Sequence, residues 1–230
     1  MRKAFITLGV ITLTVGGCHR LFGPFYYYAD PIRARVIDEP TGKPLEGAVV
    51  VAEWITDGWG LEDVLYKAEA ETDSKGEFFI PAMPITLRPP MKELRWRDPW
   101  ILVYKPGYFI ANRHNKDAYI TPITPVGVEV VTTTLPDGRV VTPGDYSGAA
   151  KRFCYWNGKI IPLEPVKTMK DEAEALNYML SDVAHRDLDP KGFARLWNAM
   201  IAGYRRLPAG DIRSSVGDPS ELMRSKMELQ

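Results

Sequence analysis

The chain has 230 residues, of which 45% are hydrophobic and 25% are charged. These fractions are typical of a globular protein and argue against a wholly disordered, collagen-like or polytopic membrane chain, and the length allows a real hydrophobic core. The 29 basic residues balance 29 acidic ones, so the usual electrostatic footprint of a nucleic-acid-binding protein is absent. The 19 glycines and 19 prolines instead predict many turns.

The amino terminus has the pattern of an export signal. Arg2 and Lys3 form a short cationic segment, an apolar run follows at residues 4–17, and small residues precede Cys18. A membrane-spanning helix needs about 20 apolar residues, so this run is too short to be a comfortable anchor. We therefore predict a signal peptide over residues 1–17 and a short tether over residues 18–30.

The end of this signal resembles the lipobox of bacterial lipoproteins. Val15-Gly16-Gly17-Cys18 fits the pattern, with Val15 where leucine is more usual. The resemblance implies attachment of diacylglycerol to the Cys18 sulfur, cleavage before Cys18 and acylation of the new amino terminus. Acyl chains of this kind hold a soluble domain on a bilayer. His19, which stands where some lipoproteins have aspartate, favours the outer membrane. The alternative is an ordinary signal peptide that contains a cysteine.

The second cysteine, Cys154, would then be the single free thiol. With Cys18 lipidated, no intramolecular disulfide is available even in an oxidising compartment. Cys154 lies among aromatic residues at 153–156, which favours a buried small hydrophobe over a reactive thiol.

The middle of the chain predicts short strands separated by turns. Apolar or alternating runs are bounded by glycine, proline and aspartate, and Asp137-Gly138 is a strong hairpin signal. This pattern favours an antiparallel β-sandwich, in which alternate side chains lie between two sheets. The expected strands are residues 32–36, 48–54, 77–80, 101–104, 128–134, 139–142 and 159–163.

Four blocks within this region, residues 34–38, 41–50, 72–78 and 104–108, resemble the carboxypeptidase regulatory-like domain. The resemblance implies a transthyretin-like (prealbumin-like) β-sandwich over about residues 31–110, and we extend the predicted domain over residues 31–165. The glycines and prolines of these blocks suit turns, and they specify architecture rather than chemistry.

Two segments are longer than a minimal domain of this kind needs, residues 55–67 and 81–100. Long loops in a compact domain are more often functional than structural. Trp59, Trp96 and Trp100 lie in or beside them, near polar groups, and such rings suit sugar stacking or protein contacts. These tryptophans are our candidate ligand-binding residues. The alternative is that they close the open ends of the sandwich.

The spacing changes to a helical period after residue 165. Thr168 and Asp171 resemble a capping box, and Asp189-Pro190 predicts the start of a second helix with proline at its first position. Two apolar stripes then predict a helical hairpin over residues 166–207. Residues 208–230 lose this periodicity and are expected to form a mobile tail.

No catalytic set is recognisable in the sequence. His19, His114 and His185 lack the spacing of a zinc carboxypeptidase, and the resemblance is to the accessory module of those enzymes. Phosphate-binding loops, nucleophile elbows and paired metal-binding cysteines are also absent. Adjacent acids at 62–63 and 171–172 indicate a solvated face. We predict no metal and no cofactor.

These observations together favour a non-catalytic lipoprotein of the bacterial envelope. The lipid on Cys18 would hold the module on the membrane, where it binds or organises another envelope protein. A glycan-binding module and an envelope hydrolase of unrecognised type are the alternatives, and nucleic acid is not an expected partner.

Overall fold

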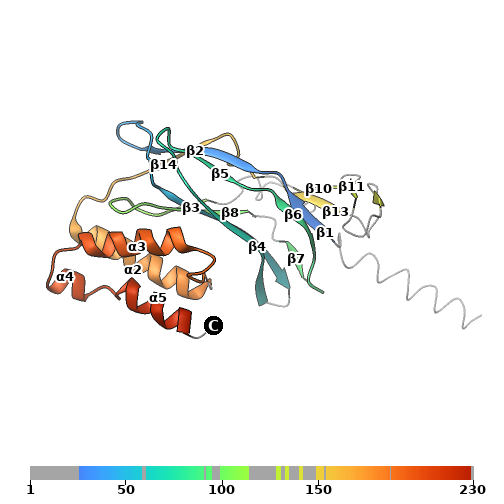
Figure 1. Ribbon diagram of the computed structural model, residues 1–230. Coiled ribbons are helices and arrows are strands. Elements are labelled where there is room, and N and C mark those ends of the chain that lie inside the picture. The colour runs from blue at the N-terminus through green and yellow to red at the C-terminus, as the bar shows by residue number, and fades with distance from the viewer. Residues whose placement is uncertain are drawn as a thin grey trace, which may run out of the picture.

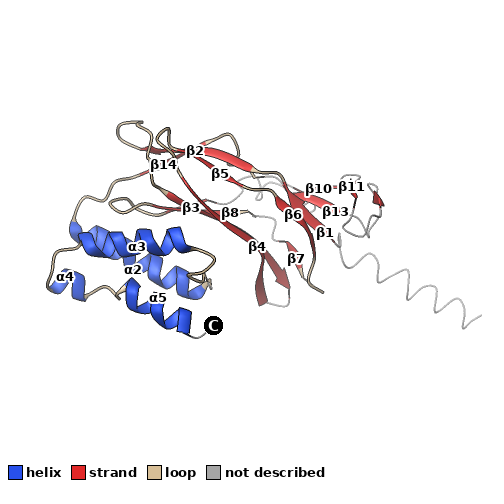
Figure 2. Ribbon diagram, in the orientation of Figure 1, coloured by secondary structure: helices blue, strands red, loops and turns tan. Residues whose placement is uncertain are grey.

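The computed structural model describes residues 26–58, 61–90, 92–94, 99–113, 128–130, 133–134, 140–141, 149–152, 154–186 and 188–228. Within these ranges the chain is mainly β and ends in helices, which confirms the predicted fold class (Figures 1 and 2). Strand residues 32–36 and 77–80 alternate between buried and exposed positions, as in half-buried strands, whereas residues 49–56 and 101–104 are all buried.

The first sheet has the order β14-β2-β5. Strand β2 (Ile32–Asp38) is central, β5 (Glu77–Ile80) pairs with it in the antiparallel sense, and β14 (Ile160–Leu163) pairs with it in parallel. The strict alternation of β2, in which Ile32, Ala34 and Val36 are buried, fixes which face of this sheet lies inward.

The second sheet has the order β4-β3-β8-β9, and β7 (Glu93–Leu94) also pairs with β3. Its strands are β3 (Val49–Gly58), β4 (Leu61–Glu71), β8 (Trp100–Tyr104) and β9 (Ala111–Arg113). All of these pairs are antiparallel. The expected loop at residues 55–67 is therefore wrong: the ends of β3 and β4 form a long hairpin there, and their pairing continues to Gly58 opposite Leu61.

The two sheets pack face to face and enclose the main core. Apolar side chains of β2, β5 and β14 meet those of β3 and β8, as in other sandwiches. The alternate side chains of β3 and β8 point the opposite way, toward the helices. The buried strand residues between the sheets are Ile32, Ala34, Val36, Val50, Ala52, Trp54, Phe78, Ile80, Ile101, Val103, Ile161 and Leu163.

The helices form a third layer over the outer face of β3 and β8 (Figure 1). Helix α2 (Met169–His185) starts with the predicted capping box of Thr168 and Asp171. Helix α3 (Ala194–Arg206) follows α2 in the chain and buries Leu196, Trp197 and Met200. No helix of the described residues is both long enough and apolar enough to cross a membrane.

The second helix starts later than predicted. Residues 190–192 form a turn rather than the first helical turn, because the Asp189 carboxylate accepts a hydrogen bond from the Gly192 N–H at 2.7 Å. Helix α3 therefore begins at Ala194, beyond the glycine.

The expected mobile tail is replaced by two short helices, α4 (Asp211–Ser214) and α5 (Pro219–Glu228). Val216 is buried in the helical core, and Leu222 and Met223 pack against it. These few apolar residues, too sparse to show a clear period in the sequence, are sufficient to dock the segment on α2 and α3.

Two further sheets involve the amino-terminal and central segments. Strand β1 (Tyr26–Ala29) pairs with β13 (Ala149–Arg152) in parallel and with β6 (Met83–Leu87) in the antiparallel sense, and β10 (Val128–Val130) joins β13. Strands β11 (Thr133–Thr134) and β12 (Val140–Val141) form a small ladder. Part of the expected tether is thus a strand, because Tyr27 and Ala29 are buried.

Candidate functional site

Most of the residues singled out in the sequence lie outside the described residues. These are Cys18, Trp59, Trp96, His19 and His114. Trp100 is described, and the side chain of His185 is not. The candidate site is therefore built from the described surface, where one open groove stands out.

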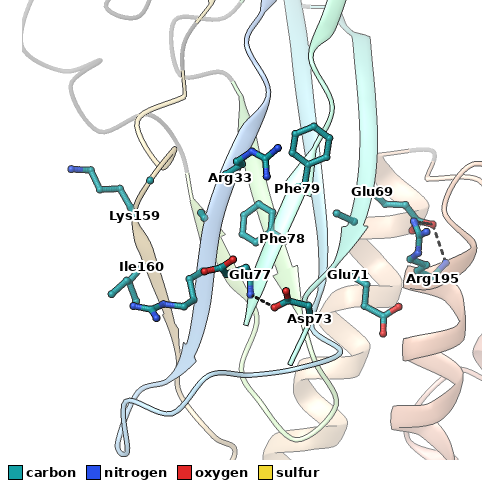
Figure 3. A pocket seen from close by; sticks show the side chains of 14 residues that line it. Arg33, Glu69, Glu71, Asp73, Glu77, Phe78, Phe79, Lys159, Ile160 and Arg195 are labelled. Carbon is teal, nitrogen blue, oxygen red and sulfur yellow. Dashed lines mark hydrogen bonds and ion pairs between the residues drawn. The ribbon is translucent and has the colours of Figure 1, made fainter. Parts of the chain in front are cut away.

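The groove lies along the outer edge of the first sheet, between β5 and β4, with a volume of about 970 Å³. Strands β14, β2 and β5 follow one another across it, and β4 and helix α3 form its far side (Figure 3). Its lining residues are Arg33, Ala34, Arg35, Glu69, Ala70, Glu71, Asp73, Glu77, Phe78, Phe79, Gly158, Lys159, Ile160 and Arg195.

The outer face of the first sheet carries cations and exposed apolar side chains together. Arg33 and Arg35 occupy the outward positions of β2, and Lys159 lies just before β14. The Arg33 guanidinium carbon is 4.5 Å from the centre of the Phe79 ring, a cation–π contact. Phe79 on β5 and Ile160 on β14, the strands that flank β2, remain 44% and 46% exposed, values that are high for large apolar side chains.

The acidic side chains of the groove are engaged mainly within the chain. The Glu69 carboxylate accepts hydrogen bonds from the backbone N–H groups of Arg195 and Leu196, at 3.1 and 3.2 Å. Asp73 accepts from the N–H groups of Lys75 and Glu77, both at 2.9 Å, and so closes the β4–β5 turn. In contrast, Arg33, Arg35 and Lys159 form no ion pair with any described residue. The lining therefore holds equal numbers of acidic and basic side chains, but the Arg33 guanidinium contacts the Phe79 ring and has no carboxylate partner among the described residues.

Glu69 also explains how helix α3 begins. Its N-cap residue, Phe193, has no side chain that can accept a hydrogen bond, so the first N–H groups of the helix need another acceptor. The Glu69 carboxylate of β4 supplies it and places a negative charge at the positive end of the helix. The far wall of the groove is therefore fixed to the sheet.

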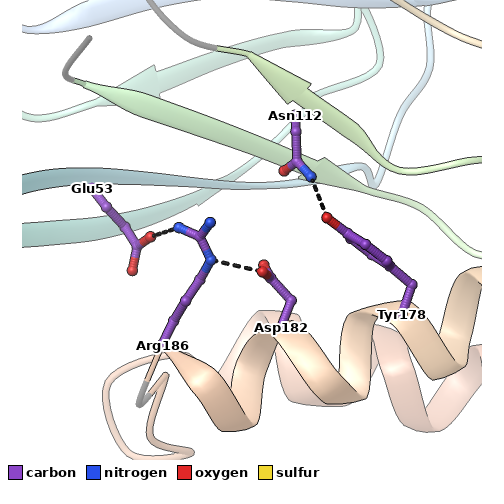
Figure 4. Close-up of polar contacts among 5 residues, drawn as sticks. All are labelled: Glu53, Asn112, Tyr178, Asp182 and Arg186. Atoms are coloured by element: carbon purple, nitrogen blue, oxygen red, sulfur yellow. Dashed lines mark hydrogen bonds and ion pairs between the residues drawn. The ribbon is translucent and has the colours of Figure 1, made fainter.

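Trp100 belongs to a different part of the molecule, a buried polar cluster between sheet and helix. It lies opposite Glu53 in the β3–β8 ladder, and the Arg186 guanidinium stacks on its ring. Arg186 pairs through Nη1 with Glu53 Oε2 at 2.5 Å and through Nε with Asp182 Oδ1 at 2.8 Å (Figure 4). Trp100 is therefore a packing partner of Arg186 and does not line the groove.

The electrostatics of this cluster are those of a buried anchor. Burial raises the pKa of the Glu53 carboxyl, and Arg186 opposes that rise only in part. The side chains of Glu53 and Arg186 are 4% and 8% exposed, so solvent screens the pair little. Beside it, the Asn112 amide donates to the Tyr178 hydroxyl at 3.2 Å (Figure 4). These contacts join helix α2 to strands β3 and β9.

One prediction about acidic pairs is wrong. Glu172 was expected on a solvated face but is 3% exposed, and its carboxylate lies 3.0 Å from Arg206 Nε. Its neighbour Asp171 serves the capping box. Arg206 is 34 positions away in the chain, so the sequence pattern around Glu172 carries no sign of this partner.

The described residues offer little for acid–base or metal chemistry. Burial raises the pKa of the Cys154 thiol to about 12, although backbone N–H groups of Trp156 and Asn157 oppose the shift. Its side chain packs against the main core, in line with the predicted structural role. No group of three or more histidine, cysteine, aspartate or glutamate side chains in the described ranges is placed to hold a metal ion.

Comparisons with known proteins do not place the chain in a family. No family model and no curated protein matches it. Among solved structures, a 3-chlorocatechol 1,2-dioxygenase from Rhodococcus opacus 1CP has 14% identity and a TM-score of 0.31, over 63% of this chain and 62% of the dioxygenase. The aligned region thus spans less than two thirds of that enzyme.

Two other solved structures are similarly distant. The major plantain pollen allergen Pla l 1 has 12% identity and a TM-score of 0.21, over 61% of this chain and 93% of the allergen. A 9R-lipoxygenase from Cyanothece PCC8801 has 15% identity and a TM-score of 0.23, over 78% of this chain and 25% of the lipoxygenase. With scores this low, nothing in these names is carried over to the chain.

The order of residues along the strands contains a sign of the groove that the overall composition does not show. Arg33, Arg35, Phe79 and Ile160 all occupy outward positions of strands whose inward residues are apolar. Arginine is ordinary at such positions, whereas the exposed apolar residues Phe79 and Ile160 depart from the usual alternation. What the sequence could not supply is that β2, β5 and β14, so far apart in the chain, are neighbours.

Proposed function

We propose that this chain is a non-catalytic, lipid-anchored binding module of the bacterial envelope. The carboxypeptidase regulatory-like resemblance and the lipobox around Cys18 support the class and the location. The groove supports a protein partner: it combines exposed apolar side chains with fixed cations on a rigid sheet, the mixture found in protein–protein contacts. The exposure of Phe79 beside Arg33 is the observation that carries the proposal.

The anchor is tested by changing Cys18 to serine in a bacterium that lipidates exported proteins. We expect the variant to lose labelling by an alkyne fatty acid and to lose membrane association in cell fractionation. The unchanged chain serves as the positive control. Membrane association that persists in the Cys18→Ser chain would contradict the anchor.

The binding role is tested by chemical cross-linking in cells that carry the full chain. The double variant Phe79→Ser/Ile160→Ser should lose cross-linked envelope proteins, because its groove no longer offers apolar area. Leu87→Ser is the matched control, since Leu87 is 61% exposed on β6, which belongs to another sheet. If both variants keep the same cross-linked proteins as the unchanged chain, the groove is not the binding site.

A further inference from the structure

Strand β5 is the edge strand of its sheet, and its hydrogen bonds to β2 determine which of its backbone N–H and C=O groups point away from the sheet. The carbonyl of Gly76 accepts from the Val36 N–H at 2.8 Å, so that pair is hydrogen-bonded across the ladder. In an antiparallel ladder such pairs alternate, which directs the N–H and C=O groups of Phe78 and Ile80 toward β2. Those of Glu77 and Phe79 point away from β2.

Of these two residues, Glu77 already has hydrogen-bond partners for its backbone groups. The carbonyl of Glu77 accepts from the Asp73 N–H, and its N–H donates to the Asp73 carboxylate, both at 2.9 Å. No described strand lies beyond β5, so the Phe79 N–H and C=O face the groove. An unpaired edge of this kind is a template for an added strand.

The side chains around this free position define what an added strand would carry. A residue paired with Phe79 would point to the same face as the Phe79 ring, where the Arg33 guanidinium lies (Figure 3). Its two neighbours would point the other way, toward the part of the lining formed by the apolar residues Phe78 and Ala70. The favoured pattern is therefore an acidic residue between two apolar residues.

Charge supports the same conclusion. On the outer face of this sheet, Glu77 lies opposite Arg35 in the ladder and partly offsets it. Arg33 and Lys159 have no such acidic neighbour in the described residues, and each contacts an aromatic ring instead. An incoming carboxylate over Phe79 would give the Arg33 guanidinium an ion-pair partner.

We propose that the open edge of β5 binds an extended acidic segment of a protein partner by strand addition. This deepens the proposed binding function and rests on it. The Phe79 N–H and C=O form the backbone hydrogen bonds, Arg33 binds the carboxylate that lies over Phe79, and the flanking apolar side chains lie beside Phe78 and Ala70 in the groove lining. Backbone pairing gives affinity, and the alternation of side chains gives specificity.

The test measures binding of a fluorescent synthetic peptide that alternates valine and glutamate to the purified full chain in detergent. Fluorescence anisotropy should show saturable binding that weakens with salt, and a peptide that alternates valine and lysine should not bind. Absence of binding by the valine–glutamate peptide, or equal binding of both peptides, overturns strand addition of an acidic segment.

Two variants separate the backbone from the side chain at the edge. Phe79→Pro removes the N–H that faces the groove without removing a bond to β2, and Phe79→Leu keeps that N–H. We expect Phe79→Pro to bind the peptide at least about tenfold more weakly than Phe79→Leu, the loss expected for one unsatisfied backbone partner. Equal affinities would overturn the proposal.

A charge variant covers the case in which Phe79→Pro fails to fold. Arg33→Glu should weaken peptide binding by about tenfold or more, whereas Arg205→Glu, an exposed arginine of α3 outside the groove, should leave it unchanged. If Arg33→Glu abolishes binding while Phe79→Pro binds as Phe79→Leu does, the face is a general anion surface, such as one for acidic lipid headgroups, and strand addition is wrong. Cross-linking that still depends on Phe79 and Ile160 would leave the binding function intact in that case.

Discussion

The outer faces of the two sheets are both formed by alternate strand residues, but helices cover one face and the other is open. On the second sheet, the outward positions of β3 and β8 carry Val49, Val51 and Leu102, and helices cover them. On the first sheet, the outward positions of β2 carry Arg33 and Arg35, and no described helix lies over them. One face is thus covered by helices of the same chain, and the other, which no described helix covers, is where we propose that a partner binds.

The comparison shows what an outward residue decides. Apolar outward positions require a further layer, because exposed Val49 and Leu102 would leave a large apolar face in water. Arginine at the same positions keeps the sheet soluble while its alkyl stem and guanidinium still offer contact area. Phe79 and Ile160 are exposed apolar residues on the open face, and Phe79 is the residue whose ring and backbone we assign to binding.

The largest expected effect concerns the covered face. Trp197→Ala should lower the free energy of unfolding by about 3–5 kcal/mol, because the side chain is fully buried and its indole N–H donates to the Leu188 carbonyl at 2.9 Å. Urea denaturation followed by circular dichroism measures this. A loss below about 1 kcal/mol would show that the helical layer is loosely packed.

A matched pair of variants compares the two faces directly. Leu102→Ala, on the covered face, should cost about 2–5 kcal/mol, since Leu102 is 4% exposed. Phe79→Ala, on the open face, should cost less than about 1 kcal/mol. Similar losses in the two urea titrations would mean that the open face is as important to stability as the covered one.

The link between β4 and α3 gives a smaller effect. Glu69→Ala removes the acceptor for the first N–H groups of α3 and should cost about 1–2 kcal/mol, the range measured for helix caps. Glu71→Ala on the same strand is the control, because its carboxylate makes no hydrogen bond to the helix. Equal losses in the two variants would exclude a capping role.

The raised pKa of Glu53 predicts that the stability of the fold depends on pH. Its folded pKa is raised above 4.5, so the folded chain binds more protons than the unfolded chain between those two values. Stability from this group is therefore present at low pH and is lost as pH rises from 4.5 through the folded pKa. The difference in unfolding free energy between Glu53→Gln and the unchanged chain should shift over that window in favour of Glu53→Gln. A constant difference would show that Arg186 fully compensates burial.

The smallest expected effect is kinetic. Because the pKa of Cys154 is about 12, its thiol stays protonated at neutral pH and should react slowly with iodoacetamide in the folded chain. Reaction should accelerate in urea and, in the folded chain, rise with pH without a plateau below pH 10. Fast labelling of folded protein at neutral pH would show an accessible thiolate. The measurement uses the full chain and mass spectrometry.

Local patterns predicted the first helix and the strands β2, β3, β5, β8 and β14, whereas β1, β4, β6, β9 and β13 were not expected. The alternation of β2 and β5 and the capping box of Thr168 depend on neighbours in sequence, so they can be read from a single chain. The hairpin of β3 and β4 was mistaken for a loop because Asp57 and Gly58 resemble turn residues, although pairing continues to Gly58. The second helix was placed too early because Gly192 was not weighed against Pro190.

The candidate site depends on long-range contacts, which explains why the sequence pointed elsewhere. The groove assembles residues from β2, β4, β5 and the segment before β14. The burial of Glu53 and Glu172 likewise depends on Arg186 and Arg206, which lie far along the chain. Tryptophan content near long segments was a reasonable local signal, but Trp100 has Arg186 as its structural partner.

The parallel pairing of β14 with β2 has a consequence for how the chain folds. Strand β2 lies near the start of the domain, but two of its partners come much later in the chain. One is the Asn157 side chain, which accepts a hydrogen bond from the Arg33 N–H across 124 positions, and the other is strand β14. Closing so large a loop is slow. Until it closes, the β2–β5 pair has two open edges that can bind other strands. A chain that emerges amino terminus first would therefore need protection from aggregation until residue 163 is available, and truncation before β14 should yield insoluble protein.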